Sequence, residues 1–456
     1  MLTYQDFEAV KDNEKKRLEF IADAIKKHRQ SDEVKIAYKA DAYNEQKNTF
    51  IKQFVKAWYD HAEFEAVPLA SNFFFNLNTQ RCAYSLGNGL TFSDAKTKEK
   101  LGNKIDNVIF KGAYNALIHG RSFFFFNVNS VATFAITEFV PLVDEETSEL
   151  RAGIRYWQND EKKPTFAVVY EEDGFTKYKG NTGYGEFEEH TPKRGYKLRT
   201  STTKAFGTQI DGEENYGSLP IVQMWGTKLH QSTLIGLKEK IDMFDIVQSG
   251  FADNVATVQQ IYWLFENAGG MKPEDYKKFR DDLRIDKIAN VNGTLTDGVK
   301  VTPYQTAVPT DAHKNCLAEL RSSLYEDFGA IDVHTISAGA TNDHIAAAYQ
   351  PMDLRADDFE YQIIEAVEKL LAFAGVEGED ATPQFKRNRI ANEREMVEML
   401  MLVAEYLDDE TILKKVPFIT PDELEEITKR KAETDMSRFG NTPTDEDTNN
   451  NQDDVA

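Results

Sequence analysis

Cysteine is scarce in this sequence, with Cys82 and Cys316 the only two among 456 residues. The two positions lie far apart, and neither belongs to a spacing typical of a metal site. A disulfide is therefore not required for folding, and we expect a chain that lives in a reducing, cytosolic compartment.

The short motifs of nucleotide, metal and hydrolytic chemistry are missing as well. The sequence contains no GxxxxGK[ST] phosphate loop, no HExxH, no GxSxG and no CxxC. The eight histidines are scattered, and the nearest pairs, such as His313 with His334, lack a ligand-type spacing. We therefore predict no enzyme activity, no cofactor and no metal site.

Long hydrophobic runs are absent too. The longest aromatic run, Phe123 to Phe126, is far shorter than the roughly 20 apolar residues of a bilayer-spanning helix. The start, MLTYQDFEAV, has neither the basic region nor the apolar core of a signal peptide. With 41% hydrophobic and 29% charged residues, the composition is typical of a soluble folded protein, and we expect no membrane partner.

Positive charge is in deficit. The chain has 54 Lys plus Arg against 76 Asp plus Glu, which gives a formal net charge of −22. Such an acidic balance argues against a protein that coats nucleic acid by neutralising phosphates. It suits a surface that repels polyanions, or one that meets a basic partner.

Two short basic stretches run against this trend. The stretch KRGYKLRTSTTK contributes Lys193, Arg194 and Lys197, and KRNR occupies positions 386–389. Their charges either offset nearby carboxylates on exposed hairpins or contact a phosphate backbone locally.

Periodicity divides the first half of the chain into helices and then strands. Helical spacing predicts helices over residues 3 to about 60 and about 94–119, the second ending at the C-cap Gly120. From Arg121 to about Val222, β-branched and aromatic residues alternate or cluster between turn signals. This pattern predicts an antiparallel sheet region rich in hairpins.

Helical spacing returns beyond residue 226. Apolar residues from Leu234 to Phe265 step by three or four, which predicts one continuous helix. A short helix after Pro273, short strands around Gly293 and Gly298 and a helix capped by Thr310 follow. Further on we expect a strand at 384–390, helix over 392–432 and a disordered acidic tail.

Residues 336–352, ISAGATNDHIAAAYQPM, place a loop of small residues before a helix that carries a proline. Asn342 and Asp343 are good helix starters, because a short polar side chain accepts from the free amides of the first turn. Pro351 has no amide hydrogen and would leave the carbonyl of Ala347 without its usual partner. We therefore predict a helix that is kinked at Pro351.

The run YGSLPIVQMWGTKLHQSTLIGLKEKIDMFDIVQSGFADNV (216–255) resembles the portal proteins of tailed bacteriophages, of the type related to the SPP1 portal. In that family a Gly-x-Leu/Ile-Pro-Ile-Val strand precedes a helix with a conserved core. The positions that match this core are Ile241, Asp242, Phe244, Asp245, Ser249, Phe251, Ala252, Asp253 and Asn254. Further motifs follow in the family order, and the resemblance covers most of residues 40–435.

The resemblance implies an α+β portal fold that assembles as a dodecameric ring around a central channel at one capsid vertex. Double-stranded DNA would pass through this channel during packaging and ejection. The implied protein partners are the large terminase subunit, the scaffold and major capsid proteins, and later a head-completion or adaptor protein. The implied location is the virion, with the host cytoplasm during assembly.

The resemblance also divides the chain into regions. They are the N-terminal helices and α+β wing (1–231), the first stem helix (232–266), the clip (267–309), the second stem helix (310–329), the tunnel loop (330–348), the kinked helix and distal wing (349–390), the helical crown (391–436) and a disordered acidic tail (437–456).

The same resemblance implies residues that face DNA. A tunnel loop of small, uncharged residues would approach a duplex closely without gripping it, and Pro351 would let the loop-bearing half of its helix swing. The loop residues are Ser337, Ala338, Gly339, Ala340, Thr341, Asn342 and His344.

Charged residues of the implied channel fall into two groups. Acidic stem residues that face the channel would repel phosphates evenly, and the candidates are Glu239, Asp242, Asp245, Asp253 and Glu319. Possible phosphate contacts are Lys193, Arg194, Lys197 and Arg355. The tunnel segment itself has no lysine or arginine before Arg355, so any direct phosphate contact there must come from His334, His344, backbone groups or the wing.

Two other functions stay open at this point. One is a different head-to-tail connector, such as an adaptor, although adaptors are usually much shorter. The other is a DNA-packaging enzyme of the nuclease type, against which stand the missing phosphate loop and the absence of a carboxylate triad. Formation of large rings without nucleotide, and without hydrolysis, would favour the portal.

Overall fold

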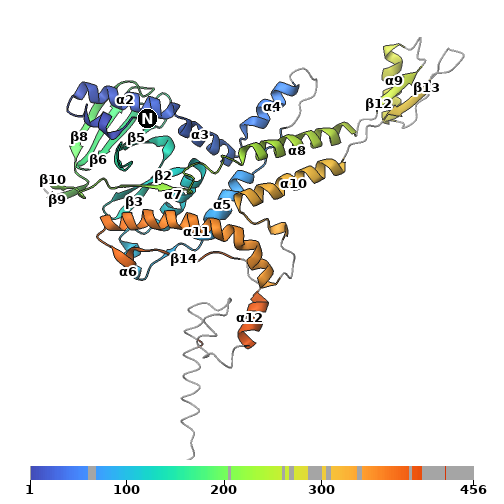
Figure 1. Cartoon of the computed structure of the whole chain (residues 1–456). Coiled ribbons are helices and arrows are strands. Elements are labelled where there is room, and N and C mark those ends of the chain that lie inside the picture. Colours follow the sequence, from blue (N-terminus) through green and yellow to red (C-terminus); the bar gives the residue numbers. More distant parts are fainter. Residues whose placement is uncertain are drawn as a thin grey trace, which may run out of the picture. The chain divides into compact units, whose positions relative to one another are not determined.

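The computed structural model describes residues 2–59, 68–203, 207–258, 262–266, 272–285, 300–304, 310–335, 341–389, 393–402 and 427. The described chain combines helices with antiparallel sheets, so the predicted α+β class is confirmed (Figure 1). It divides into two compact units. One contains Met1–Ile331 and Pro351–Asn388, and the other contains Asp332–Gln350 and Arg389–Ala456.

Helices fill most of the described chain before the first long strand, as predicted. Thr3, Asn13 and Ser31 each cap a helix by accepting the backbone N–H three residues later. The last of these helices ends at Gly120, whose φ of 99° lies where a residue with a side chain is strained. The helices are α1 (Tyr4–Glu8), α2 (Glu14–Gln30), α3 (Asp32–Asn44), α4 (Thr49–Tyr59), α5 (Phe73–Leu86), α6 (Ala95–Glu99) and α7 (Ile105–His119).

The predicted region of hairpins is also confirmed. Its largest sheet is antiparallel with the strands in chain order: β4 (Phe139–Val143), β5 (Leu150–Gln158), β6 (Thr165–Glu171), β7 (Gly174–Gly180) and β8 (Phe187–Arg194). A second sheet has the order β11 (Ile221–Trp225), β2 (Arg121–Asn127) and β3 (Ser130–Ala135), with the 3-10 turn η1 (Ile136–Glu138) after β3. A separate pair joins β9 (Lys197–Thr203) and β10 (Gly207–Glu214).

The aromatic run of β2 connects two hydrophobic cores. Successive side chains of a strand point to opposite faces of the sheet. Phe124 and Phe126 accordingly join one core, while Phe123 joins another and Phe125 packs against that same core. Both faces of this strand are thus covered, which explains why four consecutive phenylalanines are compatible with a folded, water-exposed protein.

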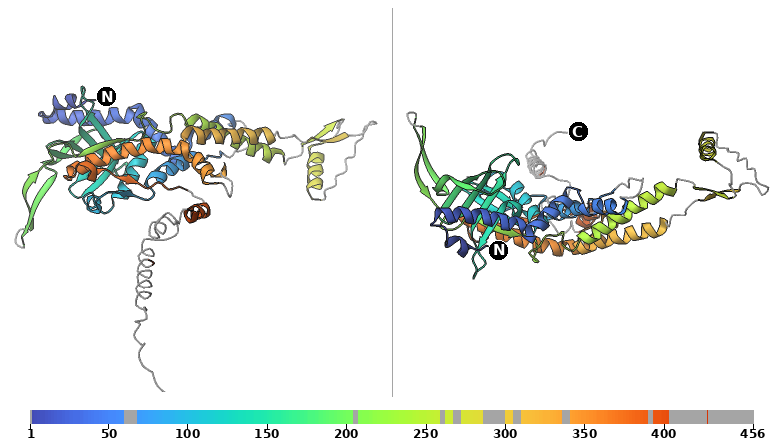
Figure 2. Two further views of the ribbon diagram at one scale, coloured as in Figure 1. Left: turned by 60° about the horizontal axis from the view of Figure 1, so that its bottom comes forward. Right: turned by 90° about the horizontal axis from the view of Figure 1, so that it is seen from above.

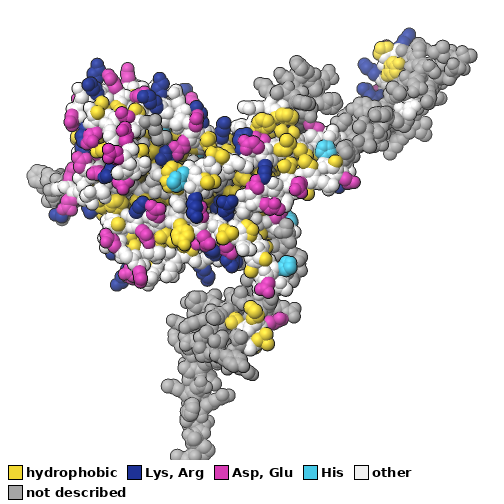
Figure 3. All heavy atoms as spheres, in the orientation of Figure 1, with side chains coloured by type: hydrophobic (Ala, Val, Ile, Leu, Met, Phe, Trp, Pro, Cys, Tyr) yellow, Lys and Arg dark blue, Asp and Glu magenta, His cyan; other side chains and the backbone are white. Residues whose placement is uncertain are grey.

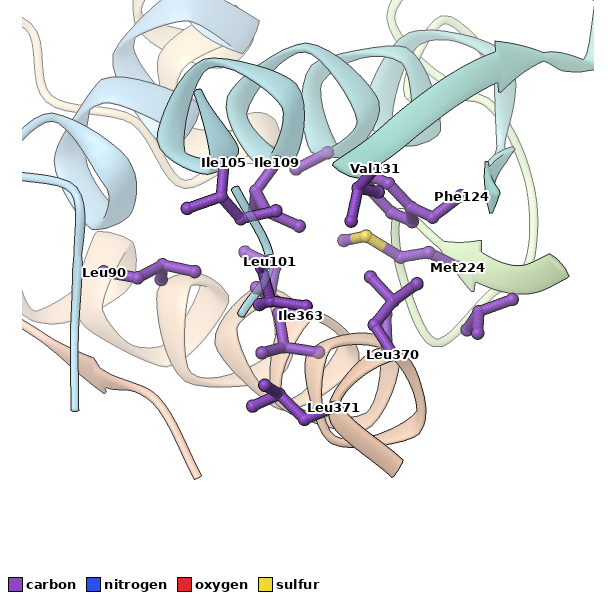
Figure 4. Packing of buried hydrophobic residues seen from close by; sticks show 14 of the residues in the cluster. Leu90, Leu101, Ile105, Ile109, Phe124, Val131, Met224, Ile363, Leu370 and Leu371 are labelled. Carbon is purple, nitrogen blue, oxygen red and sulfur yellow. The ribbon is translucent and has the colours of Figure 1, made fainter. Parts of the chain in front are cut away.

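The C-terminal part of the long helix α11 (Asn342–Phe373) covers one of these cores. Its Ile363 points toward Leu101 and Ile105, whereas its Leu370 points toward Met224 of β11 (Figure 4). The 3-10 turn η3 (Gly378–Ala381) follows, and β14 (Gln384–Phe385) pairs with β1 (Leu90–Thr91). The chain after Pro351 therefore belongs to the same compact unit as the N-terminal helices and sheets.

Two helices, α8 (Lys238–Val258) and α10 (Thr310–Phe328), lie side by side (Figures 1 and 2). Lys240 of α8 donates to Ser323 and pairs with Asp327 of α10. Toward the other end, the rings of Phe251 and His313 stack with their centroids 5.3 Å apart. Thr310, expected as the cap, is the first residue of α10.

The prediction of one continuous helix through residue 265 is wrong. Helix α8 ends at Val258, and Tyr262–Glu266 form strand β12. This strand pairs with β13 (Lys300–Tyr304), and Tyr262 lies opposite Tyr304. The short apolar run Tyr-Trp-Leu-Phe fits both periods, and its aromatic residues favour a strand when a partner strand is present.

The remaining predicted elements agree with the described residues in part. The short helix after Pro273 is α9 (Pro273–Ile285), and the helical region near the end begins as α12 (Glu393–Leu402). The strand expected at 384–390 is confined to the two residues of β14. Gly293, Gly298 and the acidic tail lie outside the described residues.

Candidate functional site

The segment that we expect to form the tunnel loop is described at residues 330–335 and again from Thr341 onward. Ser337, Ala338, Gly339 and Ala340 lie outside the described residues, and His334 before them belongs to the 3-10 turn η2 (Val333–Thr335). The Oγ1 atom of Thr341 accepts the N–H of His344 at 3.4 Å, and its carbonyl accepts the N–H of Ile345 at 3.0 Å. Thr341 thus precedes the helix, and Asn342, expected to cap it, is instead its first helical residue.

Pro351 lies inside α11, which is continuous from Asn342 to Phe373. The border between the two compact units falls between Gln350 and Pro351. The helix therefore passes from one unit to the other at the residue that lacks a backbone N–H.

Three residues of the matched α8 core form a buried polar stripe. Asp242, Asp245 and Ser249 are spaced by three and four positions, which places them on one face of the helix. They are between 0% and 6% exposed. The partners of this stripe lie far earlier in the chain, at Tyr43, Asn48, Leu69 and Ser71.

Asp242 is held by two donors. It accepts the hydroxyl hydrogen of Tyr43, and its other oxygen accepts from Lys238 at 2.5 Å. Burial and then the hydrogen bond to Asp242 raise the pKa of the Tyr43 phenol, so this hydroxyl keeps its proton and remains a donor.

Asp245 and Ser249 hold the segment before α5. Asp245 accepts from the Asn48 amide at 2.5 Å and from the backbone N–H of Ser71 at 2.9 Å. Ser249 accepts the backbone N–H of Leu69 at 3.0 Å. Burial raises the pKa of Asp245, and these donors oppose that shift. The prediction that Asp242 and Asp245 line a channel is therefore wrong, because both carboxylates are used inside the protomer.

The other acidic candidates lie at the surface of the helix pair. Glu239 of α8 and Glu319 of α10 are exposed, while Asp253 is half-buried. Acidic and basic side chains are interspersed over the visible face of the molecule (Figure 3). Glu239 and Glu319 therefore remain available to a channel.

The basic candidates differ in how free they are. Lys193 pairs with Glu171 at 3.0 Å and Asp173 at 2.5 Å, and the Lys197 ammonium lies 4.1 Å from the centre of the Tyr216 ring. Arg194 is half-buried at the end of β8, and Arg355 is exposed on α11. Lys193 therefore offsets nearby carboxylates, which is the first of the two roles considered for this basic stretch.

The KRNR stretch is built into the fold at its second residue. Arg387 pairs with Asp353 at 3.1 Å and with Glu360 at 2.8 Å, and it also pairs with Asp357. These three carboxylates lie on one face of α11, so Arg387 ties the segment around β14 to that helix.

No group of three or more His, Cys, Asp or Glu side chains arranged to hold a metal ion occurs among the residues that the structure describes. Within the same residues, no helix has both the length and the apolar character to cross a membrane.

Comparison with known proteins identifies the family. The model of the family "Phage portal protein, SPP1 Gp6-like" matches residues 8–437. The chain belongs to this family. The resemblance drawn from the sequence motifs is thereby confirmed.

Two curated relatives are similar to the chain. One is a portal protein of Clostridium phage phiCD119, 28% identical over 233 residues, which is 49% of this chain and 51% of that protein. The other is the portal protein of Bacillus phage SPP1, 26% identical over 405 residues, or 79% of this chain and 74% of that protein. The match to the first thus spans about half of its length.

Solved structures give a weaker likeness. A chain in the neck of a native GTA particle, computed with C12 symmetry, is 9% identical with a TM-score of 0.39 over 76% of this chain and 89% of that one. A chain in the neck of an empty GTA particle, computed with C6 symmetry, is 10% identical with a TM-score of 0.38 over 78% of this chain and 91% of that one.

Proposed function

We propose that this protein forms the ring-shaped channel at one vertex of a phage capsid, through which double-stranded DNA enters and leaves the head. The observation that carries the proposal is the family match over residues 8–437, nearly the whole chain. The channel is a structural conduit and not an enzyme. The motor that hydrolyses ATP would be a separate partner, the large terminase subunit.

Within this proposal, the α8–α10 pair is the stem, and the segment with β12, α9 and β13 is the clip. The N-terminal helices and sheets, together with α11 beyond Pro351, form the wing, and the region that begins with α12 forms the crown. The clip would contact the terminase and later the head-completion protein. The ring would hold twelve copies, assembled in the host cytoplasm with the scaffold and major capsid proteins.

The loop before α11 is proposed to face DNA. Its residues, Ser337 to Thr341, are small and uncharged, so a ring of such loops presents no strong phosphate site. The border between the two compact units at Pro351 supports a hinge there, because a helix is weakest where one of its hydrogen bonds is missing. The exposed Glu239 and Glu319 would keep the stem unattractive to phosphates.

Imaging of the purified full-length chain by negative-stain electron microscopy tests the proposal. Rings with a central hole and about twelve-fold symmetry are expected without nucleotide, since homo-oligomers built from head-to-tail contacts close into rings. Heads assembled without the protein should then contain no packaged DNA. A chain that stays monomeric with and without scaffold, or heads that fill normally without it, would overturn the proposal.

A further inference from the structure

A cavity of about 990 Å³ lies where the end of α10 meets α11. It is lined by the loop 226–237, by residues 326–329 at the end of α10, and by residues of α11 from Pro351 onward, with Arg81 of α5. All of these residues belong to one compact unit. The cavity is large enough for several side chains.

Arg81 contributes a buried positive charge to this cavity. Its residue is only 6% exposed, its Nη2 atom donates to the carbonyl of Phe328, and its guanidinium carbon lies 3.7 Å from the centre of the Phe328 ring. Its Nε atom is buried without a hydrogen-bond partner. Burial, and then the charge of Arg355, lower the pKa of Arg81 to about 9, while the charge of Asp358 opposes this shift.

Three carboxylates line the cavity, and two of them pair with lysines, whereas the exposed Glu326 accepts from the Ser322 hydroxyl. Asp327 pairs with Lys240, and Asp358 pairs with Lys228 at 3.5 Å and accepts the Lys228 backbone N–H at 3.2 Å. No carboxylate of the described residues lies within salt-bridge distance of Arg81 or Arg355. The cavity therefore offers two arginines with no carboxylate of the described residues at salt-bridge distance, and an incoming anion would relieve the cost of burying Arg81.

The rim of the cavity is apolar. Leu229, Ile235 and Leu354 are 70%, 44% and 66% exposed and line the same cavity. Hydrophobic, basic and acidic side chains are mixed over the region of α11 on the face seen in Figure 3. Covering this apolar rim with another protein surface lowers the free energy, because apolar side chains leave water. A phosphate backbone would bury little of this apolar surface.

We propose that this cavity receives a carboxylate side chain of a neighbouring copy of this chain, whose surface also covers the apolar rim. The inference rests on the proposed ring, in which each copy must join two different faces. A copy with 76 acidic residues has ample carboxylates to supply, and the arginines are complementary to them. Arg81 and Arg355 would bind the carboxylate, and Leu229 and Leu354 would be buried around it.

Protection of a thiol at the rim tests the contact directly. Leu354→Cys is made in a Cys316→Ser background, because Cys316 is exposed whereas Cys82 is buried. A maleimide should react with this thiol at least about tenfold more slowly in purified rings than in dissociated subunits, since interface cores exclude solvent. The matched control is Lys162→Cys in the same background, in the exposed turn between β5 and β6, which should react equally in both states.

Equal reactivity of Leu354→Cys in rings and in subunits would overturn the inference while leaving the proposed function intact. Failure of the unmodified protein to form rings both with and without scaffold would instead overturn the proposed function, and this inference with it. The two failures are thus distinguishable.

Reversing the charge of Arg355 tests whether the cavity binds a carboxylate of a neighbouring copy. Arg355→Glu should raise the protein concentration at half-assembly at least about tenfold in sedimentation velocity, whereas Lys162→Glu should leave it unchanged. Both side chains are exposed, so circular dichroism and the unfolding temperature should match those of the unmodified protein. Unchanged assembly of Arg355→Glu, together with weaker binding to a DNA duplex, would assign the cavity to a phosphate and overturn the inference.

Discussion

Asp242, Asp245 and Ser249 of α8 show how a family motif can serve the protomer rather than the channel. Their donors from the N-terminal part of the chain are Tyr43 of α3, Asn48 just before α4, and Leu69 and Ser71 just before α5, so the three residues fix α8 to these segments. Removing one such acceptor leaves a buried donor unsatisfied, which is more costly than the net value of the bond itself.

The first prediction concerns Asp245. Asp245→Ala should lower the free energy of unfolding by about 2–4 kcal/mol, because the backbone N–H of Ser71 would lose its acceptor and the Asn48 amide would keep only the Ser71 carbonyl, at 3.3 Å. The control is Glu239→Ala on the same helix, which is exposed and should change stability by less than about 0.5 kcal/mol. Urea unfolding followed by circular dichroism measures both. Equal effects would show that Asp245 is not an anchor.

The second prediction concerns acid stability. His28 is 5% exposed, its Nδ1 atom lies 3.2 Å from the Tyr156 hydroxyl, and burial followed by the Arg121 charge lowers its pKa to about 3 from 6.5. Between pH 6.5 and pH 3, His28 is protonated in the unfolded chain but stays neutral in the folded chain. The stability from neutral His28 is therefore present above pH 6.5 and is lost as pH falls toward 3.

The test compares unfolding temperatures at pH 7 and pH 5. Since one pKa unit corresponds to about 1.4 kcal/mol, His28 should contribute a loss of about 2 kcal/mol between these values. His28→Gln should unfold at a temperature that falls less between pH 7 and pH 5. His190→Gln, at an exposed position of β8, should keep the dependence of the unmodified protein. Parallel behaviour of all three proteins would contradict the prediction.

The residue scale also marks where sequence reasoning stopped. The spacing of Asp242, Asp245 and Ser249 places them on one helix face, and this was predictable. Their partners Tyr43 and Asn48 lie 199 and 197 positions earlier, and no local pattern connects such distant residues. The assignment to a channel failed because a polar stripe on a helix does not say whether water or another polar segment covers it. The burial of Arg81 beside Phe328 was not predictable for the same reason.

At the scale of elements, strong periodicity predicted well and short apolar runs did not. The hairpin region and the end of α7 at Gly120 followed from alternation and from the need for a positive φ. The predicted helix wrongly included strand β12, because its four apolar residues fit either period. Its partner strand β13 lies 34 positions away at the closest register pair, Glu266 with Lys300, so no local pattern indicates the pairing. Helix α5 was not predicted.

The third prediction concerns the helix α11. Pro351→Ala restores a backbone N–H inside a continuous helix and should stabilise it by about 1–3 kcal/mol. If Pro351 is the hinge of the tunnel segment, the stiffer helix should still form rings but should reduce the DNA packaged per head. Gln350→Ala, the exposed neighbour, is the matched control and should package normally. Normal packaging by the Pro351→Ala protein would remove the hinge from the mechanism.

At the scale of the whole molecule, the net charge of −22 sets a cost on assembly. Copies that carry the same sign repel one another in the proposed ring, and this repulsion extends over the Debye length. That length falls from about 30 Å at 0.01 M salt to about 8 Å at 0.15 M. Contacts such as the one proposed for Arg355 act over a few ångströms and are screened much less when they are buried.

The fourth prediction follows from these two ranges. The fraction of chain in rings should rise as salt increases from 0.01 to 0.15 M, because long-range repulsion is screened before buried ion pairs are. Sedimentation velocity at fixed protein concentration measures this fraction. In Arg355→Glu, which adds repulsion and removes an attraction, the rise should begin at higher salt than in the unmodified protein, with Lys162→Glu as the control. A ring fraction that falls steadily with salt would mean that attraction between exposed charges, and not burial of the apolar rim, holds the copies together.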